Sequence, residues 1–260
     1  MFHRSKSLIG AIALGLTMTA SVAGAADAVP AAIQAAVADA ARPDADKQRD
    51  ANRKPGELIA FAGIKSGDHV GDVLAGGGYF TRIFSKVVGD KGVVYAMSPP
   101  RPAPPPGAAA PARDFDAPIK AIMAEASYKN VKLGVLDPAA KPADLLDVAW
   151  TSDNYHDLHN RPNADLMAFN KTILDALKPG GTYIVIDHAA AAGSGARDTS
   201  TLHRIDPALV KSEVTAAGFT FVGESAALSN AQDPHTVPNS DPTIRGKTDQ
   251  FVYKFRKPAK

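Results

Sequence analysis

Short apolar runs alternate along this chain with stretches whose apolar residues recur at helical spacing. The runs predict strands at residues 70–74, 93–97, 131–136, 145–150, 182–186, 219–222 and 250–255. Helical spacing between them predicts helices over 80–87, 119–126 and 166–177. Such alternation predicts an α/β fold with a doubly wound, mostly parallel, seven-stranded sheet.

Proline and glycine mark the limits of further helices. Pro55 is suited to a first helical position, and Gly63 to the C-terminal cap of the same helix. Asp206 and Pro207 are suited to the N-cap and the first position of a later helix. The turn residues 178–181 are expected to end the long helix before the fifth strand begins.

A glycine-rich stretch joins the first strand to the helix that follows it. Gly76, Gly77 and Gly78 let the backbone approach a ligand closely, and the helix N-terminus offers free N–H groups and a positive dipole end. This pattern is typical of a nucleotide-binding corner. NAD is disfavoured, because Thr81 stands where a third glycine would complete G-x-G-x-x-G, and no acid ends the next strand.

The first residues have the features of an export signal. A basic start, an apolar stretch from Leu8 to Ala20 and the small-residue sequence at 23–25 predict a signal peptide over residues 1–25. The alternative is an uncleaved membrane anchor over residues 7–26, which could just span a bilayer. The stretch is rich in Ala, Gly, Ser and Thr, and this favours the signal peptide. We therefore expect a periplasmic or secreted protein.

Charge and composition exclude several classes of partner. The chain has 29 basic and 27 acidic residues, and the leader contains Arg4 and Lys6 but no acid, so the remainder is balanced. A nucleic-acid partner is therefore not expected. The absence of cysteine excludes disulfides and thiolate metal sites. No later membrane span is expected.

The length after cleavage, about 235 residues, suits one large domain. We expect an α/β domain over residues 55–260 that is interrupted by a Pro-rich surface loop at 99–113. The preceding residues, 26–54, form a charged helical lead-in. This lead-in is either a solvated segment or a lid over a site.

Several motifs resemble, in order and spacing, the class I S-adenosylmethionine (SAM)-dependent methyltransferases. They are the D-x-x-x-G-x-G corner that starts at Asp72, the acid Asp137 after the third strand, the Leu-Lys-Pro-Gly-Gly turn at 177–181 and the final strand pair. More narrowly, three stretches resemble a family of predicted, exported bacterial methyltransferases: 76–82, 201–206 and 246–251. The resemblance covers about residues 45–258.

The resemblance implies a cofactor site for SAM. The three glycines, 76–78, would line the methionine half, and Asp137 would meet the adenine amino group. The end of the second strand, where the ribose hydroxyls would bind, is Met97 or Ser98. Three further residues are assigned to the cofactor site: Asp72, Tyr79 and Asp153.

Two positions depart from the pattern of these methyltransferases. Met97 and Ser98 offer no carboxylate for the ribose. Leu74 stands where the general motif has its first glycine, and a positive φ there would cost about 1–2 kcal/mol. These departures affect the expected affinity for SAM more than the expected fold.

Histidines and aspartates gather at the predicted strand ends: His156, His159, His188, His203, Asp153, Asp157 and Asp187. One interpretation is a general base, because methyl transfer to oxygen or nitrogen requires the acceptor to lose a proton. A second is a His/Asp metal site for zinc or iron, although the spacing matches no known ligand motif. In a third, these side chains hydrogen-bond loops and cap helices.

The catalytic candidates are His156 and His188, with Tyr155 as a further one. His156 is the preferred base because it follows the fourth strand directly. The leading hypothesis is therefore a SAM-dependent methyltransferase with a small or medium-sized acceptor. One alternative is a non-catalytic ligand-binding or scaffold protein with this fold, and a weaker one is a metal-dependent enzyme that uses the His/Asp cluster.

Overall fold

The computed structural model describes residues 1, 28–99, 114–137 and 144–259. The predicted signal peptide, apart from Met1, and the Pro-rich loop from residue 100 onward lie outside the described residues. Within these ranges, no helix combines the length and the apolar character needed to cross a bilayer.

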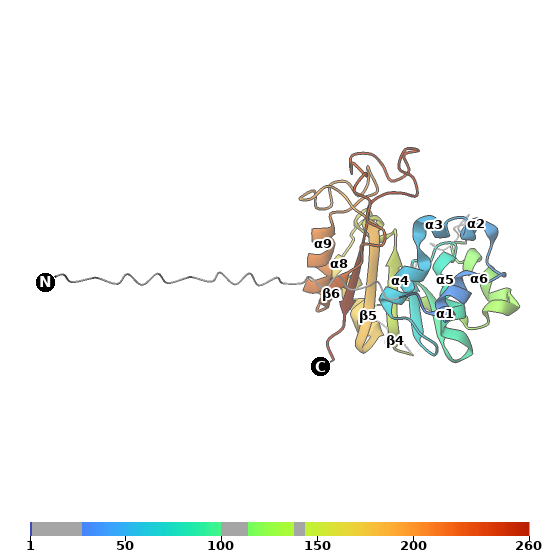
Figure 1. The fold of residues 1–260 in the computed structure, drawn as a ribbon. Coiled ribbons are helices and arrows are strands. Elements are labelled where there is room, and N and C mark those ends of the chain that lie inside the picture. The colour runs from blue at the N-terminus through green and yellow to red at the C-terminus, as the bar shows by residue number, and fades with distance from the viewer. Residues whose placement is uncertain (2–27, 100–113, 138–143, 260) are drawn as a thin grey trace, which may run out of the picture.

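A seven-stranded sheet forms the centre of the protein, with the order β3-β2-β1-β4-β5-β7-β6 (Figure 1). Its strands are β1 (His69–Val73), β2 (Val93–Ser98), β3 (Val131–Val135), β4 (Leu146–Ser152), β5 (Leu177–His188), β6 (Thr220–Glu224) and β7 (Gln250–Arg256). Strand β7 runs antiparallel to both of its neighbours, and all other pairs are parallel. The predicted fold class is confirmed.

Helices cover both faces of this sheet. They are α1 (Ala31–Val37), α2 (Asp44–Lys47), α3 (Asp50–Arg53), α4 (Pro55–Ala62), α5 (Tyr79–Val88), α6 (Ala117–Ala124), α7 (Tyr155–His159), α8 (Leu166–Ala176) and α9 (Pro207–Ala216). Helices α1, α4, α5 and α6 contribute to one apolar core, and α7, α8 and α9 to a second.

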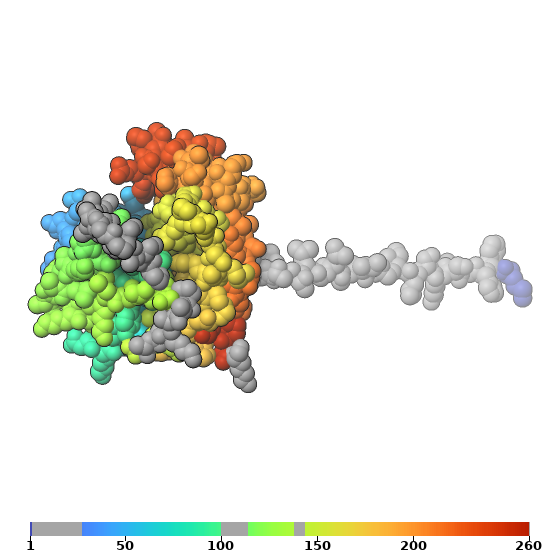
Figure 2. Space-filling model, turned by 180° about the vertical axis from the view of Figure 1, so that it is seen from behind, coloured from blue at the N-terminus to red at the C-terminus, as the bar shows by residue number. Residues whose placement is uncertain are grey.

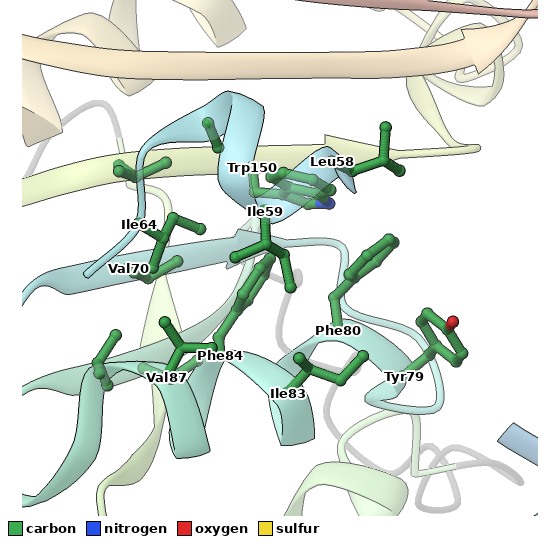
Figure 3. Packing of buried hydrophobic residues seen from close by; sticks show 14 of the residues in the cluster. Leu58, Ile59, Ile64, Val70, Tyr79, Phe80, Ile83, Phe84, Val87 and Trp150 are labelled. Carbon is green, nitrogen blue, oxygen red and sulfur yellow. The ribbon is translucent and has the colours of Figure 1, made fainter. Parts of the chain in front are cut away.

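Aromatic side chains form the centre of the first core (Figure 3). Trp150 of β4 lies against Phe80 and Phe84 of α5, with ring centroids 4.8 and 5.2 Å apart. Phe84 and Trp150 are fully buried, and Ile59 of α4 packs beside them. Because burial of such side chains stabilises by about 1.5–3 kcal/mol each, this contact fixes α5, and with it the glycine corner, on the sheet.

Two predicted helix caps are present. Gly63 ends α4 with a φ of 81°, a left-handed conformation that glycine adopts readily. The side chain of Asp206 accepts a hydrogen bond from the backbone N–H of Ala208 at the start of α9. Local sequence therefore determined these helix limits.

The predicted turn at residues 178–181 is instead part of β5. Leu146 pairs with Leu177 and Val148 pairs with Thr182, so the intervening residues of β5 bulge out of the ladder. Lys257 holds this bulge, because its backbone N–H donates to Gly181 and its carbonyl accepts from Gly180. Because Lys257 bonds to both glycines, β5 can start at Leu177, before Gly180 and Gly181.

The lead-in segment packs against the glycine corner. The guanidinium of Arg42 is fully buried and donates to both carboxylate oxygens of Asp50, at 2.8 and 2.7 Å. Asp50 also accepts a 2.6 Å hydrogen bond from the Tyr79 hydroxyl at the start of α5. The segment therefore packs over the glycine corner, and α2 and α3 lie at the same end of the sheet as the long orange and red connections (Figures 1 and 2).

Candidate cofactor and acceptor site

The chain turns sharply where β1 ends. Leu74 has a φ of 57°, Gly76 also of 57° and Gly78 of 78°, before α5 begins. The left-handed conformation at Leu74 costs about 1–2 kcal/mol, because it brings the Cβ atom close to the carbonyl oxygen that follows. Two hydrogen bonds hold it, because the N–H of Leu74 donates to Met97 at 2.8 Å and the Asn154 amide donates to Val73 at 3.3 Å. The corner thus keeps its shape without the motif's first glycine.

The three glycines of the corner face different surroundings. A Cβ atom on Gly77 would meet no protein atom within 4 Å, and one on Gly76 would meet only the Leu74 carbonyl, at 3.9 Å. A Cβ on Gly78 would lie 2.2 Å from the Cδ1 atom of Ile122 in α6. Gly76 and Gly77 therefore leave open space for a ligand, whereas Gly78 allows α5 and α6 to pack.

Two cavities meet at this corner and share Leu74, Ala75 and Gly76. The β2-side cavity has a volume of about 390 Å³, and its lining includes Met97, Ser98, Asp116, Ile119, Leu133 and Arg161. The β4-side cavity has a volume of about 290 Å³, and its lining includes Arg53, Asp72, Gly77, Tyr79, Ser152 and Asp153. Most of the predicted cofactor residues therefore line one continuous edge of the sheet.

Asp137 follows β3, as predicted, but it does not line the β2-side cavity, where Leu133 of the same strand does. Asp116, the N-cap residue of α6, lines the cavity instead. A carboxylate is thus present on the side of Met97 and Ser98 although β2 does not supply one.

Asp72 is buried beneath the β4-side cavity. Burial raises the pKa of its carboxyl to about 7, although the Thr81 hydroxyl, which donates a 2.5 Å hydrogen bond, and the charge of Arg53 both oppose this. A cation that entered the cavity would favour the ionised form. Asp72 is therefore placed to respond to a positively charged ligand.

Tyr79 lines the β4-side cavity, and three arginines of the lead-in lie over its ring. Its ring lies 5.4 Å from the guanidinium of Arg42, 5.1 Å from that of Arg49 and 4.7 Å from that of Arg53. These are cation–π distances. Burial and the hydrogen bond to Asp50 raise the pKa of the Tyr79 hydroxyl. The ring thus orients the lead-in cations over the corner.

Asp153 lies at the carboxyl end of β4, in a left-handed conformation with a φ of 60°. Arg53 forms a 2.8 Å ion pair with it, and the Gln250 amide donates to it at 2.8 Å. Burial opposes the charge on Asp153, but the charge and hydrogen bond of Arg53 and the hydrogen bond from Gln250 favour it, and the pKa is lowered. The carboxylate is therefore ionised at neutral pH.

A third cavity, the polar cavity, lies between the lead-in and the segment that joins β6 to β7. Its volume is about 820 Å³. Its cationic lining residues are Arg49, Arg53, Lys54, Arg245 and Lys247. Asp153 supplies the one carboxylate that the described residues contribute to this lining, and Arg53 already neutralises it. The polar cavity is therefore positively charged.

His188 lines the polar cavity at the carboxyl end of β5. Its Nδ1 atom lies 2.7 Å from the Thr248 hydroxyl and 3.1 Å from the Gln250 amide. Burial lowers the pKa of His188, against the opposing charges of Asp153 and Asp187. The imidazole is therefore neutral at neutral pH, which is the charge state that a general base requires.

The other two catalytic candidates point elsewhere. His156 is buried, and its backbone N–H and Nδ1 atom both contact Asp187, at 2.7 and 2.8 Å. The Tyr155 hydroxyl is 3.0 Å from the Glu213 carboxylate, to which it donates, and accepts from Asn170 at 2.8 Å. Neither residue lines any of the three cavities, so His188 is the catalytic candidate that the fold brings to them.

Comparison with solved structures identifies the fold. A SAM-dependent methyltransferase from Aquifex aeolicus superposes with a TM-score of 0.56 at 17% identity, over 82% of this chain and 95% of that one. A putative sarcosine dimethylglycine methyltransferase from Galdieria sulphuraria gives a TM-score of 0.55 at 14% identity, over 84% and 89%. Neither a family model nor a curated protein matches the sequence. The chain has the class I methyltransferase fold.

The same fold also occurs with another named reaction. The [4+2]-cyclase SpnF superposes with a TM-score of 0.55 at 16% identity, over 82% of this chain and 83% of that one. Fold similarity alone therefore does not define a reaction, which has to be argued from the site.

Proposed function

We propose that this protein is a SAM-dependent methyltransferase whose acceptor is a small or medium-sized anion. The observation that carries the proposal is the pair of cavities that meet at Leu74, Ala75 and Gly76. The polar cavity adjoins the β4-side member of this pair at Arg53 and Asp153. Together they form a continuous edge long enough for a two-part ligand and a second substrate.

The charges of the two corner cavities suit the two halves of SAM. The β4-side cavity is lined by both signs of charge, from Arg49, Arg53, Asp46, Asp72 and Asp153. Such a lining complements the ammonium and carboxylate groups of a methionine half. The β2-side cavity is largely apolar and would take the adenosine, with Asp116 near the ribose.

The polar cavity would hold the acceptor. Its cations favour a carboxylate or phosphate group, and it shares Arg49, Arg53 and Asp153 with the β4-side cavity, so an acceptor there would lie beside the methionine half. Bound SAM supplies an electrophilic methyl group. The residues of the chain position the acceptor, and His188 is the proposed base that takes its proton.

The experiment that tests this function is calorimetric titration of the purified chain with SAM, followed by detection of S-adenosylhomocysteine in the presence of candidate acceptors. Saturation at 100 times the dissociation constant should stabilise the chain by about 2.7 kcal/mol. A chain that binds SAM but releases no product with any acceptor supports the alternative of a non-catalytic ligand-binding protein. A chain that gives neither heat nor stabilisation contradicts both SAM binding and methyl transfer.

Charge reversal in the polar cavity tests the nature of the acceptor. Lys247→Glu should raise the KM for an anionic acceptor about tenfold, equivalent to about 1.4 kcal/mol, because an exposed cation of the lining becomes a repelling anion. The heat of SAM binding should not change. Lys129→Glu, an equally exposed lysine beyond the three cavities, is the matched control. An unchanged KM in Lys247→Glu would contradict the anionic acceptor.

We also propose that the protein is exported. The predicted signal peptide over residues 1–25 supports this. Fractionation of cells that express a C-terminally tagged chain should find the product outside the cytoplasm, with an N-terminus near Ala26. A full-length product in the cytoplasmic fraction would contradict export.

A further inference from the structure

Three potential metal ligands converge outside the cavities of the proposed site. His156, Asp157 and His203 each offer one ligand atom, and these three atoms all lie within 4.8 Å of one another. The Asp157 oxygen is 3.3 Å from the His156 nitrogen and 3.6 Å from the His203 nitrogen. Ligands about 2.0–2.1 Å from a tetrahedral zinc ion lie about 3.3 Å from each other. The observed spacing thus matches two edges of such a tetrahedron.

The environment of His156 suits a metal ligand. Its Nδ1 atom is 2.8 Å from the carboxylate of Asp187, whose side chain is fully buried. Asp187 is itself held in place, because it accepts backbone hydrogen bonds from His156 and His188, each at 2.7 Å. A carboxylate behind a histidine fixes the tautomer with hydrogen on Nδ1, and this directs the lone pair of Nε2 towards a metal.

The ligands come from two separate parts of the chain. His156 and Asp157 are consecutive residues of the short helix α7. Consecutive side chains of a helix normally point in different directions, and ion pairs form between residues three or four apart, so the close approach of these two is unusual. His203 precedes α9 and has a φ of 50°, an uncommon backbone conformation that tends to persist at functional sites. Its ring lies edge-on to that of His156, with centroids 5.5 Å apart.

The open side of the cluster faces solvent. The side chain of Asp157 is 50% exposed and that of His203 is 48% exposed, whereas that of His156 is only 3% exposed. Water can therefore reach a metal at this point as a further ligand. The donor set of two imidazoles and one carboxylate suits zinc and related transition metals rather than calcium or magnesium.

We propose that His156, Asp157 and His203 form a zinc-class metal site, with water as the fourth ligand and Asp187 as the outer partner of His156. The metal would join α7 to the segment before α9. It would also fix the ring of His156 next to His188, whose centroid is 6.1 Å away. The site lies outside the three cavities, so the proposal holds whether or not SAM binds.

The test is zinc binding to the purified full chain, prepared without a histidine tag. After equilibration with zinc and dialysis, elemental analysis should find one Zn²⁺ per chain, and zinc should raise the unfolding temperature. Cobalt in the same site should give the visible absorption of tetrahedral coordination. Asp157→Asn and His203→Ala should each lower zinc affinity by more than the 10–100-fold typical of outer partners.

His235→Ala is the matched control. His235 also has a left-handed backbone, with a φ of 58°, and its Nε2 atom lies 3.0 Å from a carboxylate oxygen of Asp249. Its replacement should leave zinc binding unchanged. Less than one zinc ion per wild-type chain would overturn the proposal, and Asp157 would then only form ion pairs with His156 and His203. Zinc retained by both folded ligand variants, or lost equally in the control, would also overturn it.

Discussion

Valine at position 77 should abolish SAM binding while the chain remains folded. Gly77 lines the β4-side cavity, its backbone is outside the left-handed region, and an added Cβ would meet no protein atom within 4 Å. The branched side chain would therefore fill the space in which the methionine half has to approach the backbone. We expect affinity to fall by at least about 100-fold, equivalent to about 2.7 kcal/mol, with an unchanged unfolding temperature. Calorimetry and thermal unfolding measure the two quantities.

Gly78 is the less informative position for this experiment, although the motif alone predicts that valine there would block the cofactor and leave the sheet intact. The structure corrects that expectation, because a Cβ at Gly78 would lie 2.2 Å from Ile122 and the φ is 78°. Gly78→Val would disturb the packing of α5 on α6. Gly223→Val in β6 is the matched control, since it also adds a Cβ in open space but lies outside the cavities. Tight SAM binding by Gly77→Val would exclude the corner as the cofactor site.

The fold was predictable because its signals are local. Buried strands such as β4 and β5 appear in the sequence as apolar runs, and Pro55 and Gly63 mark the limits of α4. The start of β5 was not predictable, because the bulge before Thr182 depends on backbone hydrogen bonds to Lys257, which lies far away in the sequence.

The candidate site was predictable in part for the same reason. The glycines, Asp153 and His188 lie at or shortly after the ends of strands, and parallel strands place their carboxyl ends together. The direction of a side chain in a short helix is not encoded so simply. Tyr155 and His156 begin α7, which turns them towards Glu213 and Asp187 rather than towards the cavities.

Nothing in the sequence predicted that the cations of the polar cavity would meet. Arg53 ends a short helix of the lead-in, while Arg245 and Lys247 lie in the long segment before β7. Lys247 belongs to the stretch 246–251 that resembles a methyltransferase family, but Arg53 and Arg245 look like ordinary solvated charges in the sequence. Only tertiary folding brings these cations to one cavity. The charge of the lead-in was one available hint, and contacts among Arg42, Asp50 and Tyr79 hold this segment against the glycine corner.

Loss of Arg204 should lower the free energy of unfolding strongly. Arg204 donates to Asp233 through two nitrogens, at 2.8 and 3.0 Å, and both side chains are fully buried. It also donates to the carbonyls of Ala189 and Val237, so it joins the segment after β5 to the one before β7. Arg204→Met should lower the free energy of unfolding by about 3–5 kcal/mol, because it leaves the Asp233 carboxylate buried without its partner. Chemical denaturation measures this change.

Arg197→Met is the matched control, because Arg197 makes a similar two-nitrogen contact with Asp198, at 2.8 Å for each bond, but its own side chain is 69% exposed. Its replacement should have little effect on the free energy of unfolding.

The dependence of stability on pH gives a second test. Burial disfavours the charge on Asp233, but hydrogen bonds from Arg204 and two backbone N–H groups outweigh it and hold the pKa below 3.8. The contribution of Asp233 is therefore present above pH 3.8 and lost as the pH falls through the lower folded pKa. Asp233→Asn should remove this acid-dependent part of the stability. Equal stability of Arg204→Met and Arg197→Met would contradict the role of the buried Arg204–Asp233 pair in joining the segment after β5 to the one before β7.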